Sequence, residues 1–195
     1  MVENVLSIFI DEAGDYGTVN DDIKDFSDQF YIICLVLHEQ NHDINKQMAY
    51  LDIRLKSREY DQPMIHCGPL IRKEYPFRGF KREEVRGILN DLIWFVKSIN
   101  ISYYPIIVDK RICHNRDDVE KHMLTAITNL INTCYQYFNS FSEIHIYYDN
   151  GQRLVSNVLS HTFEQELPNT DRRLIQPKDY KLFQGSYSLM GRTTI

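Results

Sequence analysis

Three apolar segments that each end in an acidic residue constrain the fold of this 195-residue chain more than any other feature. Asp11 and Glu12 follow the segment SIFI, Asp109 follows PIIV, and Asp149 follows HIYY. Short runs of β-branched, aromatic and aliphatic residues are typical of buried strands. Ligand sites in open α/β sheets gather at strand ends, so these acids predict a site at one end of a sheet.

The order of apolar patterns predicts an α/β fold. Strands are expected over residues 5–10, 29–37, 99–108, 144–148 and 173–176, the first two as a hairpin. Helices are expected over residues 41–58, 81–98, 117–138 and 153–167. Residues 61–79 contain five prolines and glycines, which predict an irregular segment. The alternation after residue 99 indicates crossover units on a mostly parallel sheet.

Composition places the chain among ordinary globular proteins. It has 22 Lys and Arg against 27 Asp and Glu, a net charge of -5, and 43% hydrophobic residues. These values exclude a disordered or collagen-like chain, and the length fits a single domain over residues 1–195. The longest apolar run, residues 31–37, is too short to cross a membrane, so no membrane partner is expected. Four dispersed cysteines without a C-x-x-C pair indicate reduced thiols, and a cytoplasmic location is expected.

The strand-end acids are candidates for metal binding. Carboxylates that converge on one point repel one another unless a cation lies among them. Mg²⁺ and Mn²⁺ prefer such oxygen ligands, so Asp11, Asp109 and Asp149 are the candidate metal ligands. One strand-end Asp alone is more often a turn former or helix cap, but the recurrence favours a paired-metal site for phosphoryl transfer.

The segment 61–86 supplies candidates for proton transfer and substrate binding. His66 lies among prolines and glycines, and a lone histidine is usually structural, yet six Lys and Arg against three Glu follow in residues 72–86. Arg72, Arg78 and Lys81 are the candidates for phosphate binding here. Three aromatic residues interleave with these bases and fit either stacking on single-stranded bases or anchoring in the core. They are Tyr75, Phe77 and Phe80.

The segment YYDNGQ gives two further substrate-binding candidates. Gln152 and Arg153 fall on the first turn of an expected helix, where they can direct an amide and a guanidinium at a phosphate. An Asn-Gly turn capped by Asp149 is the structural alternative. Both interpretations can hold together.

Four motifs in combination resemble a known family. The segments IDEAGDYG, IHCGPLIR, IYYDNGQ and PKDYKLFQ resemble the bacterial and phage family called domain of unknown function 3800, over most of the chain. The resemblance implies a ribonuclease-H-like fold, a mixed sheet flanked by helices, without an established activity. It also implies that Asp11, Glu12 and Asp149 correspond to the acidic signature of the family, with Asp109 and His66 as further candidates.

The resemblance ends after Gln184. Family members usually continue with two small residues and an Asp that opens a last apolar helix, whereas this chain has no acid after Asp179. That acid helps to hold a metal in ribonuclease-H-like sites. Two explanations are open: the reading frame is shifted or truncated after Gln184, or this member has given up metal catalysis and kept a binding role. The last helix is then missing or altered, and an exposed apolar patch is expected, with either a homo-oligomer or poor solubility as its consequence.

The leading hypothesis is an Mg²⁺- or Mn²⁺-dependent nuclease-like protein that hydrolyses a phosphodiester of RNA or DNA. Asp11 and Asp149 ligate the metal, Glu12 or Asp109 completes the set of ligands, and His66 assists proton transfer. The alternative is a non-catalytic interaction or scaffold protein, phage- or defence-associated. A nucleotide-binding enzyme ranks last because no Gly-rich phosphate loop occurs.

Overall fold

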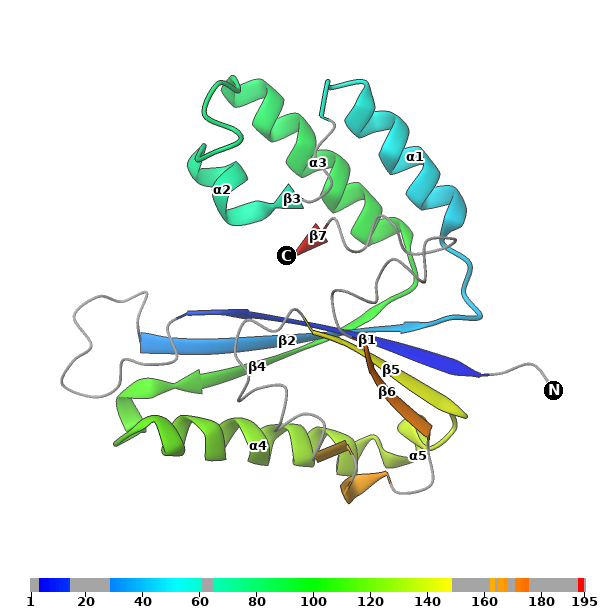
Figure 1. Cartoon of the computed structure of the whole chain (residues 1–195), viewed down its shortest axis with the longest axis vertical. Helices are drawn as coiled ribbons and strands as arrows, with labels where there is room; N and C mark the ends of the chain where they lie inside the picture. The colour runs from blue at the N-terminus through cyan, green and yellow to red at the C-terminus, as the bar shows by residue number, and fades with distance from the viewer. Residues whose placement is uncertain are drawn as a thin grey trace. The chain divides into compact units, whose positions relative to one another are not determined.

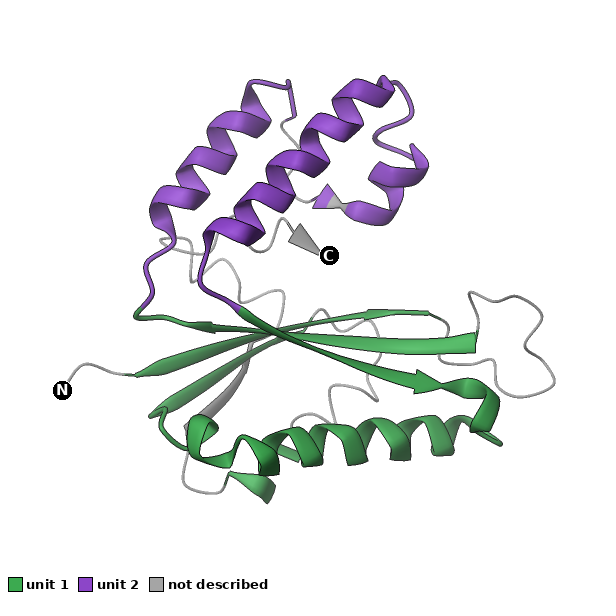
Figure 2. Cartoon of the chain, turned by 180° about the vertical axis from the view of Figure 1, so that it is seen from behind, with its two compact units in different colours: residues 1–41, 102–177 green, residues 42–101, 178–195 purple. Residues whose placement is uncertain are grey.

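The computed structural model describes residues 4–14, 29–60, 65–148, 162–163, 165–167, 171–175 and 193–194. Side chains are described for these residues except 66, 171–175 and 193–194. Contacts within the chain define two compact units (Figure 2). Unit 1 comprises residues 1–41 and 102–177, and unit 2 comprises residues 42–101 and 178–195. The single domain over residues 1–195 stays a prediction.

Unit 1 is built on a five-stranded sheet in the order β4-β2-β1-β5-β6 (Figure 1). β2 is antiparallel to β1 and to β4, whereas β1 pairs in parallel with β5, and β5 with β6. The α/β class and the first hairpin are confirmed. The sheet is mixed, because β2 lies between β1 and β4 and runs opposite to both, whereas β4, β1, β5 and β6 all run in the same direction, as expected for the second half of the chain. The strands are β1 Val5–Ala13, β2 Phe30–Glu39, β4 Ser102–Asp109, β5 Glu143–Tyr148 and β6 Asp171–Ile175.

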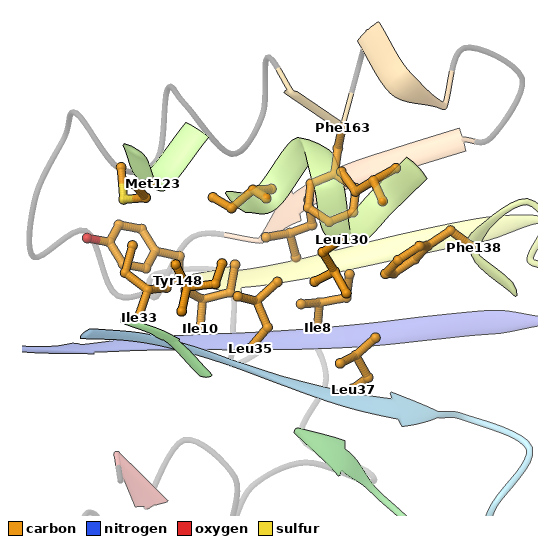
Figure 3. Packing of buried hydrophobic residues seen from close by; sticks show 14 of the residues in the cluster. Ile8, Ile10, Ile33, Leu35, Leu37, Met123, Leu130, Phe138, Tyr148 and Phe163 are labelled. Carbon is orange, nitrogen blue, oxygen red and sulfur yellow. The ribbon is translucent and has the colours of Figure 1, made fainter. Parts of the chain in front are cut away.

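The core of unit 1 lies between the sheet and helix α4, Arg116–Thr133, which runs along one face (Figure 1). Alternate residues of β1 point to this face because side chains alternate along a strand. Ile8 and, from β2, Leu35 are fully buried there, and Figure 3 shows them packed with Met123 and Leu130 of α4. Because Ile8 and Ile10 face this core, the residues between and next to them in β1 point to the opposite face of the sheet.

The single helix expected over residues 117–138 is wrong in one respect. The structure has α4 and a separate short helix, α5, over Tyr135–Phe138. Cys134 between them has φ -106° and ψ 25°, outside the helical region. The sequence has no glycine or proline at this position to mark the break.

Unit 2 is mainly helical. α1 (Asn45–Lys56) packs against α3 (Arg82–Ser98), and both confirm the expected helices. Their buried residues recur at helical spacing, for example Leu51 and Leu55 in α1. Ile88 of α3 is fully buried in the same core.

An ion-pair cluster links α1 to α3. Asp91 of α3, whose side chain is only 7% exposed, accepts hydrogen bonds from Arg54 Nε at 3.1 Å and Arg58 Nε at 2.5 Å. Gly87 lies one turn before Asp91, and a Cβ atom there would come within 2.3 Å of Arg58 Nη1. Because Gly87 has no side chain, the Arg58 guanidinium has room to lie beside α3.

The expected irregular segment is wrong for residues 65–72. These residues form the short strand β3, Ile65–His66, and the helix α2, Cys67–Arg72. Pro69 is the third residue of α2, in its first turn, where the missing N–H has no helical partner in any case. β3 pairs in parallel with β7, Thr193–Thr194.

Two expectations fall largely outside the described residues. Of the helix expected over residues 153–167, residues 162–163 and 165–166 are described, and they are helical. The altered last helix expected after Gln184 lies outside the described residues. No helix in the described part of the chain is both long and apolar enough to span a membrane.

Candidate functional site

Asp11 and Glu12 lie within β1, which continues to Ala13 and not only to residue 10 as expected. Successive strand residues point to opposite faces of a sheet. Glu12 therefore shares the core-facing side with Ile8, and Asp11 lies on the opposite side. The two adjacent acids reach different surroundings.

The Glu12 carboxylate is held by two buried tyrosines. Its Oε2 atom accepts hydrogen bonds from the hydroxyl of Tyr31 and from the hydroxyl of Tyr148, the latter at 3.1 Å. Both donors are neutral, so an ionised Glu12 keeps its full negative charge. Among the described residues, no cation forms an ion pair with Glu12. The arrangement fixes the orientation of a carboxylate without neutralising it.

Asp11 faces a half-buried thiol across the strand pair. The register of β1 and β2 places Asp11 opposite Cys34, and the register of β2 and β4 places Cys34 opposite Pro105. Burial, and then the charge of Asp11, raise the pKa of Cys34. The thiolate is therefore disfavoured, and Cys34 does not fit the role of a nucleophile.

Asp109 serves a local structural purpose. Its Oδ1 accepts a hydrogen bond from the backbone N–H of Arg111 at 3.0 Å, which caps the short 3₁₀ helix Lys110–Ile112. The Arg111 guanidinium binds both carboxylate oxygens, at 2.9 and 2.6 Å. The side-chain hydrogen bond from Arg111 lowers the pKa of Asp109. Asp109 is thus a helix cap, the structural alternative considered above for a strand-end Asp.

The structure does not bring Asp109 to Asp11. Asp109 pairs with Phe30 and Asp11 with Cys34, so the two acids are two strands and four residues apart. With standard strand spacings, their Cα atoms are roughly 16 Å apart. Metal–oxygen bonds are only about 2 Å long, so this separation does not support one metal bound by both. A metal role for Asp109 stays a prediction.

Three candidates lie outside the described residues: Asp149, Gln152 and Arg153. The last described pair of the parallel β1–β5 ladder is Ile10 with Tyr148. These two residues directly precede Asp11 and Asp149 in the sequence. Within the described residues, no group of three or more His, Cys, Asp or Glu side chains could hold a metal ion.

The candidates from the basic segment belong to unit 2. The backbone of His66 is in β3, and its side chain is not described. Arg72 is engaged by Glu74, with Nε–Oε1 and Nη2–Oε2 distances of 2.8 and 3.0 Å. Arg78 and Lys81 are exposed. Of the three predicted phosphate-binding residues, Arg72 is thus already paired.

The three aromatic residues of this segment have different roles. Phe77 is 1% exposed and is part of the core of unit 2. Phe80 is partly buried and contacts Phe77 edge to face, with ring centroids 5.6 Å apart. Tyr75 is 83% exposed. Core anchoring is confirmed for Phe77, whereas Tyr75 lies on the surface and stacking by it stays a prediction.

Sequence reasoning missed the tyrosine partners of Glu12. Tyr31 and Tyr148 come from β2 and β5, so their contact with Glu12 depends on the register across three strands. The strict alternation of strand side chains was a signal that could have separated Asp11 from Glu12. No comparable signal gives the register itself.

A polar network on the Asp11 side of the sheet was also missed. Gln40 Nε2 donates to Ser7 Oγ at 2.9 Å, and His145 Nε2 lies 2.8 Å from Glu143 Oε2. Ser7 and His145 are both buried and are partners in the β1–β5 ladder. These contacts give His145 a structural role in the packing of the β1–β5 pair.

The fold and these contacts define an α/β protein with a mixed sheet, in which the Glu12 carboxylate, held by two tyrosine hydroxyls, lies near the carboxyl end of β1. Comparison of the chain with protein-family models gives no match, and no curated protein sequence matches it significantly.

Proposed function

We propose that the protein is a metal-dependent, nuclease-like hydrolase of RNA or DNA phosphodiesters, with Mg²⁺ or Mn²⁺ bound by Asp11 and Asp149. The observation that carries the proposal is the parallel register of β1 and β5, which pairs Ile10 with Tyr148. The next residue in each segment of the sequence is an aspartate. The carboxyl ends of neighbouring parallel strands are where ligand sites form in α/β sheets.

The electrostatics of β1 support this proposal. Glu12 receives only neutral donors in the described structure, so it adds negative charge next to Asp11 along the strand. Oxygen ligands with net negative charge suit hard divalent cations. By contrast, Asp109 is paired with Arg111, which makes it the weaker candidate for completing the set of ligands.

A bound divalent metal supplies activation of a water molecule and stabilisation of the leaving oxygen. In this proposal Asp11 and Asp149 hold that metal, and His66 moves a proton near neutral pH. Arg78, Lys81, Gln152 and Arg153 bind substrate phosphates. The finer fold assignment, ribonuclease-H-like, belongs to the same proposal and is supported by the mixed sheet with α4 on one face.

The test is thermal unfolding with and without millimolar Mn²⁺ or Mg²⁺. A ligand that binds only the folded state raises its stability, by about 2.7 kcal/mol at one hundred times Kd. We expect a higher Tm for the unaltered protein with metal, and loss of that shift in Asp11→Asn. Asp117→Asn is the matched control, because it removes the same charge from an exposed position in the first turn of α4.

A Tm shift in both the unaltered protein and Asp117→Asn, absent in Asp11→Asn, supports the site. Metal-dependent cleavage of a labelled RNA or DNA by the same three proteins then tests the reaction. The proposal fails if the unaltered protein shows no shift, or if Asp11→Asn keeps it.

A second candidate function is a non-catalytic interaction protein. Edge strand β4 favours it, because Tyr103 and Ile107 on one side of this strand are 71% and 61% exposed. Exposed apolar side chains on a sheet edge are typical of sites that contact a protein partner. This candidate predicts no metal-dependent shift in Tm and partner binding that Tyr103→Ser weakens.

A further inference from the structure

Unit 2 presents one tyrosine to solvent from a firmly anchored loop between α2 and α3. Tyr75 is 83% exposed, whereas Phe77, two residues later, is 1% exposed. The Phe77 ring stacks on Tyr60 with centroids 5.6 Å apart and an interplanar angle of 6°. An exposed ring next to a buried anchor loses little conformational freedom when a flat ligand stacks on it.

Backbone hydrogen bonds close the loop on both sides of Tyr75. Glu74 N donates to Pro69 O at 2.8 Å, and Phe77 N donates to Glu74 O at 2.6 Å. Phe80 N donates to Phe77 O at 3.0 Å before α3 begins. The loop is thus tied to α2 at its start, and at its end Lys81 N donates to Glu84 Oε2 of α3 at 2.5 Å.

Positive charge surrounds the exposed ring. Arg72 ends α2, and Lys73 and Arg78 follow on the loop with one acid, Glu74, which gives a local excess of positive charge. The hydrogen bond from Arg72 lowers the pKa of Glu74 against the opposing effect of desolvation, and the charges of Arg72 and Arg78 lower it further. The positive charge of Arg78 therefore acts on Glu74, the residue next to Tyr75.

Two of these cations are available to a ligand. Lys73 and Arg78 are exposed, and neither has an ion pair in the described part of the chain. Lys73 has φ 56°, a left-handed conformation that non-glycine residues adopt mainly at tight turns. Lys81, also exposed, follows at the start of α3.

We propose that the loop of residues 72–81 binds single-stranded RNA or DNA, with a base stacked on Tyr75 and phosphates bound by Lys73, Arg78 and Lys81. Stacking on an exposed aromatic side chain beside cations is how proteins bind single strands without reading their sequence. The inference rests on the proposed function for the choice of nucleic acid, and it adds the single strand as substrate class. A duplex offers no free base face to Tyr75.

The test is fluorescence anisotropy of labelled oligouridine and oligothymidine with the full chain in EDTA, which removes any contribution from a metal. We expect Tyr75→Ala to weaken binding on the order of tenfold, because one stacked base is lost. Tyr75→Phe keeps the ring and is expected to bind normally. Tyr135→Ala is the matched control, since Tyr135 is also exposed but lies on α5 in unit 1.

Salt dependence tests the phosphate contacts. Binding weakens with salt, and the magnitude of the slope of log K against log salt decreases by about 0.7 for each single-strand phosphate contact that is lost. We expect Lys73→Gln to reduce the slope by about that amount, and Lys121→Gln, an exposed lysine of α4, to leave it unchanged.

Three results overturn the inference: no binding at low salt, equal losses in Tyr75→Ala and Tyr135→Ala, or equally tight binding of a polyglutamate, which indicates an acidic protein partner. Thermal unfolding of the unaltered protein and of Asp11→Asn, with and without metal, is measured alongside binding. It separates this inference from the proposed nuclease function. If binding depends on Tyr75 while the metal shift in Tm is absent, the loop binds nucleic acid and the nuclease proposal fails. If the metal shift is present but Tyr75→Ala binds normally, only the loop assignment fails.

Discussion

In unit 1 the Glu12 carboxylate accepts hydrogen bonds from two neutral tyrosine hydroxyls, whereas in unit 2 the Asp91 carboxylate is bound by two arginines. Tyrosine donors orient an ionised carboxylate and leave its charge in place. The guanidinium groups of Arg54 and Arg58 neutralise Asp91 and leave an excess positive charge. The groups that bind a carboxylate therefore decide how much negative charge it keeps for a further cation.

Asp109 extends this comparison within unit 1. It follows an apolar strand, as Asp11 and Asp149 do in the sequence, yet it is paired with Arg111 as Asp91 is with Arg54. The position of an acid at a strand end is therefore insufficient to assign it to a metal site. Its nearest cation has to be known as well.

The largest effects are expected from truncating one leucine in each core. Leu35 of β2 and Leu51 of α1 are almost completely buried. Each Leu→Ala change is expected to lower the free energy of unfolding by about 2–5 kcal/mol. Leu35→Ala is expected to cost more, because alanine is unfavourable in strands and favourable in helices. Urea unfolding of both variants measures the difference, and a larger loss in Leu51→Ala contradicts it.

The next largest effect is expected from removing the charge of Asp91, compared with removing that of Glu12. Asp91→Asn is expected to lower the free energy of unfolding by about 2–3 kcal/mol, because two guanidinium groups lose their counter-charge. Glu12→Gln is expected to cost about 1 kcal/mol or less, because an amide oxygen still accepts hydrogen bonds from the tyrosines. Equal losses in the two variants, measured by urea unfolding, contradict the distinction between charged and neutral partners.

Acid dependence gives an independent measure of the Asp91 cluster. Burial opposes ionisation of Asp91, but hydrogen bonds from Arg58 and Arg54 outweigh it and lower the pKa. The stability from this carboxylate is therefore complete above its unfolded pKa of about 3.9 and is lost as pH falls through the lower folded pKa. The stability difference between the unaltered protein and Asp91→Asn should be constant from neutral pH to about 5 and shrink below about 4. A constant difference at all pH values contradicts this.

The smallest effect is expected at Gly87. An alanine there favours the helix by about 0.5–1 kcal/mol, but its Cβ comes within 2.6 Å of Arg58 Cζ and displaces the guanidinium from Asp91. We expect Gly87→Ala to change the free energy of unfolding by less than about 1 kcal/mol, the two contributions opposing each other. In an Arg58→Ala background the same change should stabilise, by about 0.5–1 kcal/mol. The same effect in both backgrounds contradicts a clash with Arg58.

The sequence predicted the main strands and the two long helices of unit 2, because period-two and helical apolar patterns follow directly from burial of one face. The prediction failed for α2. A proline is compatible with a helix only in its first turn, and the sequence does not show that the helix begins at Cys67, close enough to place Pro69 there. Asp11 and Glu12 were expected directly after a strand ending at residue 10, and the structure places both within β1. Their separation onto opposite faces required knowing that the strand continues to Ala13.

Cross-strand partners were beyond the sequence for a physical reason. The hydrogen bonds of Tyr31 and Tyr148 to Glu12 depend on the register of β1 with two other strands. A shift of one residue would send either side chain to the opposite face. The ion pair of Asp109 with Arg111 is local, two residues apart, and was open to prediction.

The pairing of β1 with β5 also sets an order of events during synthesis. It joins Val5 to Glu143, so translation at about 5–20 residues per second separates the two partners by on the order of ten seconds. The β1–β2 hairpin and the α1–α3 pair involve closer parts of the chain and form faster. During that interval one edge of β1 lacks its β5 partner, and an unpaired strand edge of this kind is prone to pair with other chains.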